Sequence, residues 1–234
     1  MQKNMSLIGK SGTLSTATLK DQAYALIREN ILFHKLTPGE VYAQDAFCSE
    51  LGISRTPVRE ALLQLQQEGY VRFLRGKGIE VVPVTGKRAA AIIEARYYLE
   101  PHACYLAAKR RTEEHLKKLD AVLRAMDENM ERRDPDVMYQ LDRQFHALIF
   151  EAADNEWLSD CLNRLRDDFL RVETYSAFDS LEQAHAVWEE HCKIANTLRD
   201  GDASAALEAM QEHLYQITAR TGRHLPSLLS RSKL

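Results

Sequence analysis

The chain has little glycine, proline or aromatic residue: 10 Gly, 6 Pro and 8% Phe, Trp and Tyr among 234 residues. This composition, with 45% hydrophobic and 28% charged residues, excludes a fibrous or low-complexity protein and is typical of a globular one. Uncharged runs are far shorter than the roughly 18 apolar residues of a membrane span, and residues 1–14 lack the apolar core of a secretory signal. We therefore expect a cytoplasmic protein without a membrane partner.

Cysteine is scarce as well. The chain has four cysteines, at positions 48, 104, 161 and 192, and none of them forms a CxxC pair. A disulfide framework or a cysteine-ligated zinc site is therefore not expected.

A strong net charge is also missing, because 31 Lys and Arg stand against 34 Asp and Glu, which gives −3. The average hides an asymmetry: residues 1–83 carry a net +2, whereas residues 84–234 carry −5. Such asymmetry indicates two domains with different partners. We expect a flexible arm over residues 1–17, a first domain over residues 18–83 and a second over residues 84–234.

The first domain has the element order of a DNA-binding module. Apolar residues recur at helical spacing over residues 18–34, a short second helix fits residues 44–51, and Ser54 can cap a third helix that Gly69 ends. Residues 70–83 are rich in β-branched and aromatic residues around a central glycine pair, which predicts a hairpin. This order predicts a winged helix-turn-helix, whose third helix normally enters the DNA major groove.

The second domain is expected to be entirely helical, so the fold class is mainly α. Short breaks separate the predicted helices, which favours an antiparallel bundle of six. The predicted helices cover residues 86–109, 113–132, 136–153, 155–175, 181–199 and 203–221.

Basic residues gather on the two elements of the first domain that would face DNA. Arg55 and Arg59 are four residues apart, so they share one side of the third helix near its positive end, where they could act on phosphates and guanine edges. Arg72, Arg75 and Lys77 add positive charge to the predicted wing. The alternative is an ordinary solvated surface, which the joint pattern makes the weaker interpretation.

The sequence Leu-Gly-Ile-Ser-Arg-Thr-Pro-Val-Arg-Glu-Ala-Leu at residues 51–62 resembles the GntR family of bacterial winged-helix regulators. The resemblance implies that the third helix and the wing tip contact double-stranded operator DNA. Some branches of the family carry a DNA-contacting arginine early in the second helix, where this chain has Gln44 and Asp45. The candidate DNA-binding residues are Ser54, Arg55, Thr56, Arg59, Arg75, Gly76, Lys77 and Gly78.

Four polar side chains fall on faces of the bundle helices that should be buried. Asp142 and His146 lie inside or beside the apolar stripe of the third bundle helix, one turn apart. His191 and His213 lie within the apolar arcs of the fifth and sixth. Buried polar groups without partners cost free energy, but these four could share a cation and leave coordination positions open for a ligand oxygen. The alternative is that each is a satisfied core residue.

Arg96 also falls within an apolar arc, on the first bundle helix. It could pair internally with Glu100 one turn on, or clamp a ligand carboxylate, and the two roles are compatible. Four further arginines are expected mainly on the surface, with the last of them a weaker pocket candidate: Arg143, Arg164, Arg166 and Arg171.

The spacing of Asp142, His146, His191 and His213, with Arg96 upstream, resembles the FCD ligand-binding domain of GntR regulators. The resemblance implies one divalent metal per chain, zinc or nickel, held by the aspartate and three histidines, with a small organic acid or sugar acid bound over it. Six bundle helices rather than seven make the chain similar to the VanR-like subgroup.

These observations predict a homodimeric transcriptional regulator, by resemblance a repressor, whose operator affinity responds to a carboxylate effector bound beside Arg96. In one alternative the metal itself is the signal, or only a structural staple. In another the metal site is that of a hydrolase. No nucleophile, extra base or second metal cluster accompanies the site, so we expect no catalytic residues and no enzyme.

Overall fold

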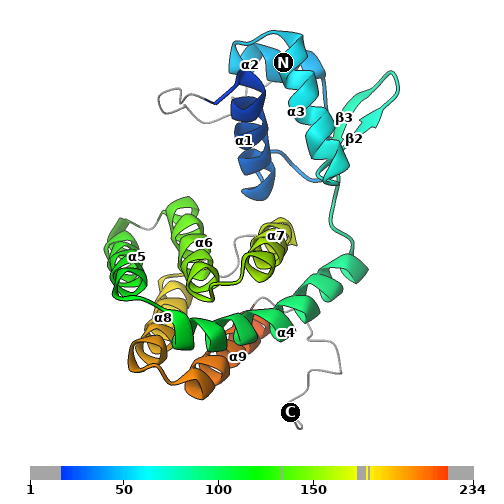
Figure 1. Cartoon of the computed structure of the whole chain (residues 1–234). Coiled ribbons are helices and arrows are strands. Elements are labelled where there is room, and N and C mark those ends of the chain that lie inside the picture. Colours follow the sequence, from blue (N-terminus) through cyan, green and yellow to red (C-terminus); the bar gives the residue numbers. More distant parts are fainter. Residues whose placement is uncertain (1–16, 133, 173–177, 179, 221–234) are drawn as a thin grey trace. The chain divides into compact units, whose positions relative to one another are not determined.

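The structure of the protein is a computed structural model that describes residues 17–132, 134–172, 178 and 180–220 (Figure 1). The chain divides into two compact units between Thr85 and Gly86. Nearly all of the predicted arm, together with positions 173–175 and 221 of two predicted helices, lies outside the described residues.

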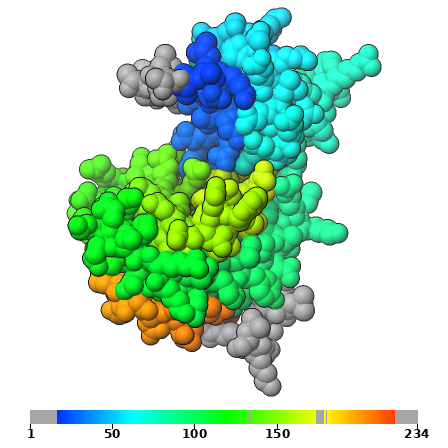
Figure 2. All heavy atoms as spheres, viewed as in Figure 1, coloured from blue at the N-terminus to red at the C-terminus, as the bar shows by residue number. Residues whose placement is uncertain are grey.

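The first unit is a winged helix-turn-helix, as predicted. Apolar side chains from its three helices form a common core, in which Ile27, Phe47 and Leu62 are at most 1% exposed. The β2–β3 hairpin projects from the body of this unit (Figure 1, Figure 2). The elements are α1 (Leu19–Leu32), β1 (Val41–Tyr42), α2 (Gln44–Leu51), α3 (Arg55–Gln67), β2 (Val71–Leu74) and β3 (Gly78–Val81).

The wing contains a strand that the sequence pattern did not predict. β1 pairs antiparallel with β3, which in turn pairs with β2, so the sheet order is β1-β3-β2. Gly78 has a φ of 131°, and a Cβ there would overlap the carbonyl oxygen of Tyr42 on β1. The glycine therefore permits the third strand. A strand of two residues is too short to show the alternation by which strands are predicted.

Two details of the helices differ from the sequence-based expectation. α1 ends at Leu32, two residues before the predicted end, because Phe33 is its C-cap and His34 has a positive φ of 53°. Ser54 does occupy the N-cap position of α3, but its hydroxyl makes no capping hydrogen bond. The Ser54 side chain is exposed instead.

The second unit is a bundle of six helices in the described residues, again as predicted. α4 packs against α6, α7, α8 and α9, while α5 packs against α6 and α8. In the predicted inner stripe of α6, Met138, Phe145 and Ile149 are buried, and Leu141 is partly buried. In the part of the chain that the structure describes, no helix is long and apolar enough to cross a membrane. The helices are α4 (Gly86–Arg110), α5 (Glu113–Arg132), α6 (Pro135–Ala152), α7 (Glu156–Val172), α8 (Leu181–Asp200) and α9 (Ala203–Arg220).

Candidate functional site

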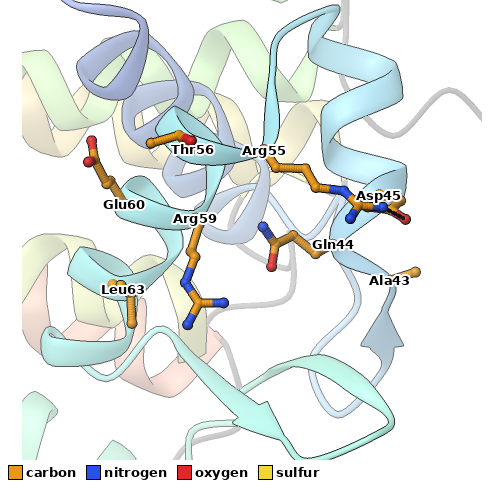
Figure 3. A pocket seen from close by; sticks show the side chains of 8 residues that line it. All are labelled: Ala43, Gln44, Asp45, Arg55, Thr56, Arg59, Glu60 and Leu63. Carbon is orange, nitrogen blue, oxygen red and sulfur yellow. Dashed lines mark hydrogen bonds and ion pairs between the residues drawn. The ribbon is translucent and has the colours of Figure 1, made fainter.

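The outer face of α3 carries exposed polar residues. Val58, Leu62 and Leu65 face the core, so the helical period leaves Arg55, Thr56 and Arg59 in solvent. Together with the first turn of α2, this face borders a hollow of about 550 Å³ (Figure 3). Its lining residues are Ala43, Gln44, Asp45, Arg55, Thr56, Arg59, Glu60 and Leu63.

The basic residues of α3 and of β2 differ in how they are paired. Arg55 donates a hydrogen bond from Nη2 to Oδ2 of Asp45 over 2.8 Å, and Arg72 on β2 makes two hydrogen bonds to Glu80 on β3. Arg59, by contrast, makes no ion pair with any described residue. It extends into the hollow beside α2 (Figure 3).

The wing tip offers a second set of polar groups. Arg75, Gly76 and Lys77 form the exposed turn between β2 and β3, and Gly76 has a φ of 71° that suits glycine. Gly78 follows the turn and begins β3. The structure therefore places the candidate DNA-binding residues on two elements of one unit, α3 with its N-cap and the hairpin.

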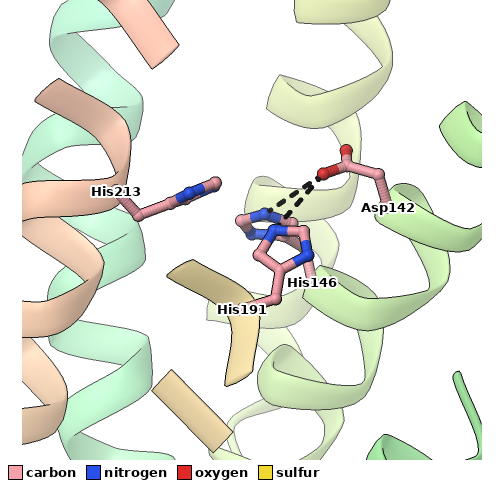
Figure 4. Close-up of side chains that lie close together, drawn as sticks. All are labelled: Asp142, His146, His191 and His213. Carbon is pink, nitrogen blue, oxygen red and sulfur yellow. Dashed lines mark ion pairs between the residues drawn. The ribbon is translucent and has the colours of Figure 1, made fainter. Parts of the chain in front are cut away.

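In the bundle, the four candidate metal ligands lie together although they come from three helices. One donor atom from each of Asp142, His146, His191 and His213 lies within 4.8 Å of the other three (Figure 4). Both carboxylate distances are longer than hydrogen bonds: Oδ1 of Asp142 is 3.5 Å from Nε2 of His191 and 3.8 Å from Nε2 of His146. All four side chains are buried.

These distances fit a shared cation. Zinc–nitrogen bonds measure about 2.0–2.1 Å, so two donors on one ion lie about 3–4 Å apart. Among the described residues, neither Nε2 of His146 nor either ring nitrogen of His191 has a hydrogen-bond partner. Buried nitrogens without partners are costly, and coordination would satisfy them. The donor set could thus hold a metal ion.

The electrostatics of the cluster favour neutral histidines and an ionised aspartate. Burial, reinforced by the Arg166 guanidinium, lowers the pKa of His146 to about 4. Burial and the neighbouring imidazoles lower the pKa of His191 well below its usual value. Burial raises the pKa of Asp142, but Arg166 and His146 outweigh it, and the net shift is downward. Neutral imidazoles and an ionised carboxylate are the forms that bind metals.

Similarity to known proteins covers both units. Residues 19–81 match the family described as bacterial regulatory proteins, gntR family, and residues 91–216, more than half of the chain, match the FCD domain. The chain belongs to the GntR family of transcriptional regulators. As an FCD-domain GntR regulator it is a member of a DNA-binding family and not an enzyme.

Individual relatives of this GntR regulator extend over most of its length. It is 27% identical to the HTH-type transcriptional repressor RspR of Escherichia coli K12, over 87% of this chain and 89% of the relative. It is 28% identical to the gluconate operon transcriptional repressor of Bacillus subtilis 168, over 71% and 68%. Escherichia coli McbR/YncC has a similar fold, with a TM-score of 0.79 at 21% identity over 87% of this chain and 97% of that chain.

Two glutamates contact histidines of the cluster in this GntR regulator. Oε2 of Glu100 on α4 lies 2.9 Å from Nδ1 of His146 without hydrogen-bond geometry, and Oε2 of Glu190 on α8 is hydrogen-bonded to Nδ1 of His213 over 2.8 Å. Because the carboxylates contact Nδ1, Nε2 is the nitrogen of each ring that could bind a metal. Histidine ligands at metal sites commonly have a carboxylate on their second ring nitrogen. The sequence pattern indicated Glu100 only as a partner of Arg96 and did not indicate Glu190. The one sequence feature of Glu190 that points to the cluster is its position next to His191, and neighbours on a helix project in different directions.

Arg220 anchors the second of these glutamates. Its guanidinium makes two hydrogen bonds to Glu190, of 2.7 and 2.8 Å, from the end of α9. Burial raises the pKa of Glu190, but His213 and Arg220 outweigh it and lower the pKa overall. The carboxylate is therefore ionised at neutral pH.

Two buried arginines lie next to the cluster. Arg96 donates to Glu100, as one of its two predicted roles required, and its guanidinium lies 3.8 Å from the centre of the Phe169 ring. Arg166 was expected on the surface, but it is 4% exposed and pairs with Asp142. That expectation was wrong because Arg166 lies on the inner face of α7, where a buried carboxylate compensates its charge.

The other three arginines expected mainly on the surface are divided between core and surface. For Arg171 that expectation was also wrong, because its side chain is 6% exposed and pairs with Asp168 on its own helix. Arg143 is partly exposed and pairs with Asp167, while Arg164 is exposed. The structure therefore brings Arg166, rather than Arg143 or Arg164, to the candidate metal ligands.

Proposed function

We propose that this GntR regulator is a homodimeric repressor in the cytoplasm whose operator affinity is controlled by a small carboxylate metabolite, bound at a divalent metal in the bundle. The observation that carries the proposal is the His₃Asp cluster inside the unit joined to the winged helix. Two relatives are named as repressors, which supports repression over activation. Six described bundle helices support the VanR-like subgroup.

One divalent metal per chain, zinc or nickel, would be held by Asp142, His146, His191 and His213. When bound, it would supply Lewis-acid coordination to an effector oxygen, because four protein ligands leave positions open in an octahedral shell. The buried charges support an anionic effector. Arg96 and Arg166 balance Glu100 and Asp142, so a divalent ion brings uncompensated positive charge that a carboxylate would offset.

Arg96 is the proposed effector-binding residue. Its Nε donates to Glu100, but its Nη2 is buried without a hydrogen-bond partner among the described residues. A buried donor in that state is stabilised by an added acceptor such as a carboxylate oxygen. The internal pair orients the guanidinium, so the two predicted roles of Arg96 support each other. The name of the gluconate operon repressor fits a sugar acid as one class of effector.

The proposed DNA contacts are those of the winged helix, from Ser54, Arg55, Thr56 and Arg59 on α3 and from residues 75–78 on the wing. A homodimer would present two α3 helices to two half-sites on one face of the operator. An effector that binds one arrangement of the two chains better shifts the population toward it, and a changed spacing weakens operator binding.

The test is a titration of labelled operator DNA at fixed salt, with and without candidate sugar acids and organic acids. We expect an effector to weaken binding by the metal-loaded protein but not by His191→Ala, which loses the metal. Arg59→Ala is the matched control: it loses specific DNA binding and keeps the metal. Unchanged operator affinity across all acids would refute effector control.

The second candidate is a regulator for which the metal is the signal. The ring nitrogens of His191, which have no hydrogen-bond partner in the described part of the chain, favour it because a metal ion would satisfy them. Chelation distinguishes the candidates. A metal sensor changes operator affinity when free metal is varied without any acid, whereas an effector-controlled protein changes only when the acid is added.

A further inference from the structure

The first turn of α2 carries a carboxylate at the edge of the DNA-binding face. Asp45 is the second residue of α2 and accepts a hydrogen bond from Nη2 of Arg55 over 2.8 Å (Figure 3). Both side chains remain open to solvent, with 63% of Asp45 and 75% of Arg55 exposed. The pair therefore lies where DNA would approach, and not inside the protein.

This carboxylate changes the electrostatics of the hollow between α2 and α3. Its charged lining residues are two arginines, Arg55 and Arg59, and two acids, Asp45 and Glu60, which sum to zero. A helix start normally attracts a phosphate through its free N–H groups and its dipole. A carboxylate in the first turn of α2 opposes that attraction. The hollow is thus poorly suited to hold a DNA phosphate.

The same carboxylate orients Arg55. A guanidinium has five N–H donors in a rigid plane, and the bond to Asp45 uses only one of its nitrogens. The remaining donors can reach a guanine edge, which accepts two parallel hydrogen bonds at O6 and N7. An arginine held in one orientation loses less conformational freedom on binding than a free one. Arg59, which has no ion pair among the described residues, lacks this support.

We propose that Asp45 is a specificity-determining residue of the DNA interface. It positions the Arg55 guanidinium to read one base pair of each half-site, and its negative charge lowers the affinity for DNA of any other sequence. α2 then contributes by orienting a neighbouring side chain instead of contacting a phosphate. The inference rests on the proposed operator binding by α3.

The experiment compares the full-length wild type with Asp45→Ala, Asp45→Asn and Glu50→Ala. Glu50→Ala is the matched control, because it removes one carboxylate from α2 at a residue that does not line the hollow. Each protein first selects duplexes from a random-sequence library. Affinities are then measured for the selected motif, for each of its single-base variants and for random duplex, at several salt concentrations.

We expect Asp45→Ala to lose about 5- to 10-fold of discrimination at one position of each half-site, since a wrong base typically costs 5- to 150-fold in affinity. Its affinity for random duplex should rise, with a salt dependence steeper by up to about one phosphate contact. Asp45→Asn keeps an acceptor for Arg55, so it should retain the discrimination but bind random duplex more tightly. Glu50→Ala should discriminate as the wild type does.

Two results would overturn the inference. If Asp45→Ala selects the same motif with unchanged discrimination at every position, Asp45 does not position Arg55, although the proposed operator binding stands. If the wild type selects no motif, operator recognition by this face fails, and the inference fails with it.

Discussion

Arginine and aspartate pair in both units, but under opposite conditions. Arg55 and Asp45 of the winged helix have 75% and 63% of their side chains exposed, whereas Arg166 and Asp142 of the bundle have 4% and 9%. Water screens the first pair, so it contributes little to stability, and the other N–H donors of Arg55 stay accessible to a base. The second pair lies in a medium where a lone charge is expensive, so neither partner can leave.

The comparison explains why charge is distributed differently in the two units. The exposed face tolerates the unpaired Arg59, which solvent stabilises until DNA arrives. In the bundle each charge beside the cluster has an opposite neighbour, from Arg96 with Glu100 to Arg220 with Glu190. Ligands that enter the bundle must therefore leave its buried positive and negative charges balanced. Such a site selects its ligands by their net charge.

The largest expected effect comes from breaking the buried pair. Arg166→Met leaves Asp142 buried without its cation and should cost about 3–5 kcal/mol of bundle stability in the metal-free protein. Replacing both residues, with Arg166→Met and Asp142→Leu, should recover most of that loss. Urea unfolding followed by tryptophan fluorescence measures it, because both tryptophans, Trp157 and Trp188, lie in the bundle. A single variant as stable as the double variant would contradict the comparison.

Acid should destabilise the metal-free bundle by the next largest amount. The pKa of His146 is about 4 in the folded protein and about 6.5 in an unfolded chain. As the pH falls, the unfolded chain takes up this proton first, so the stability present above pH ~6.5 is lost as the pH falls to ~4. The loss is about 3 kcal/mol. His191, whose pKa is also lowered, adds to it in the same direction.

Urea unfolding with a chelator, between about pH 7 and pH 4.5, tests the acid effect. His146→Gln should flatten the pH dependence. His185→Gln should leave it unchanged, because the His185 side chain is 52% exposed. A bundle whose stability does not vary over this range would show that the histidines are not held neutral by burial.

Metal affinity should depend on a residue outside the ligand set. Glu190→Gln removes the charge that holds Nδ1 of His213, and loss of such a partner typically lowers metal affinity 10- to 100-fold. Competition for Zn²⁺ with a chromophoric chelator measures it. Glu189→Gln is the control, since that neighbouring side chain is 66% exposed and pairs only with His185 in the described residues. Equal affinities of the two variants would remove Glu190 from the site.

Sequence patterns predicted the winged helix-turn-helix, the six helices and the inward direction of Asp142, His146, His191 and His213, because helical period determines which side of a helix is buried. They did not predict the side chains that pair with Asp142 and His213. Arg166 on α7 pairs with Asp142 on α6, and Glu190 on α8 pairs with His213 on α9, so each contact depends on how two helices pack and joins residues 24 or 23 positions apart. Arg166 was expected on the surface, although helical period places it with Leu162 and Phe169 on the apolar face of α7, where a charge indicates a buried counter-charge.

β1 illustrates a second limit. Its two residues carry no periodic pattern, and the strand exists because Gly78 lets the Tyr42 carbonyl approach β3. Asp45 illustrates a third. A carboxylate at the start of α2 is a common feature of helix first turns, and only the position of Arg55 across the hollow gives it a further role.

The smallest expected effect is on the exposed side of the comparison. Arg55→Met should change the stability of the winged helix by less than about 1 kcal/mol, because the screened pair with Asp45 contributes little and its loss frees two side chains. Amide hydrogen exchange of peptides from α1 and α3 measures the opening of this unit separately from the bundle. A loss above about 2 kcal/mol would mean that the exposed pair stabilises its unit much as the buried pair does, and would contradict the comparison. Unchanged hydrogen-exchange protection together with weakened operator binding would show that Arg55 contributes to DNA recognition and not to the stability of the winged helix.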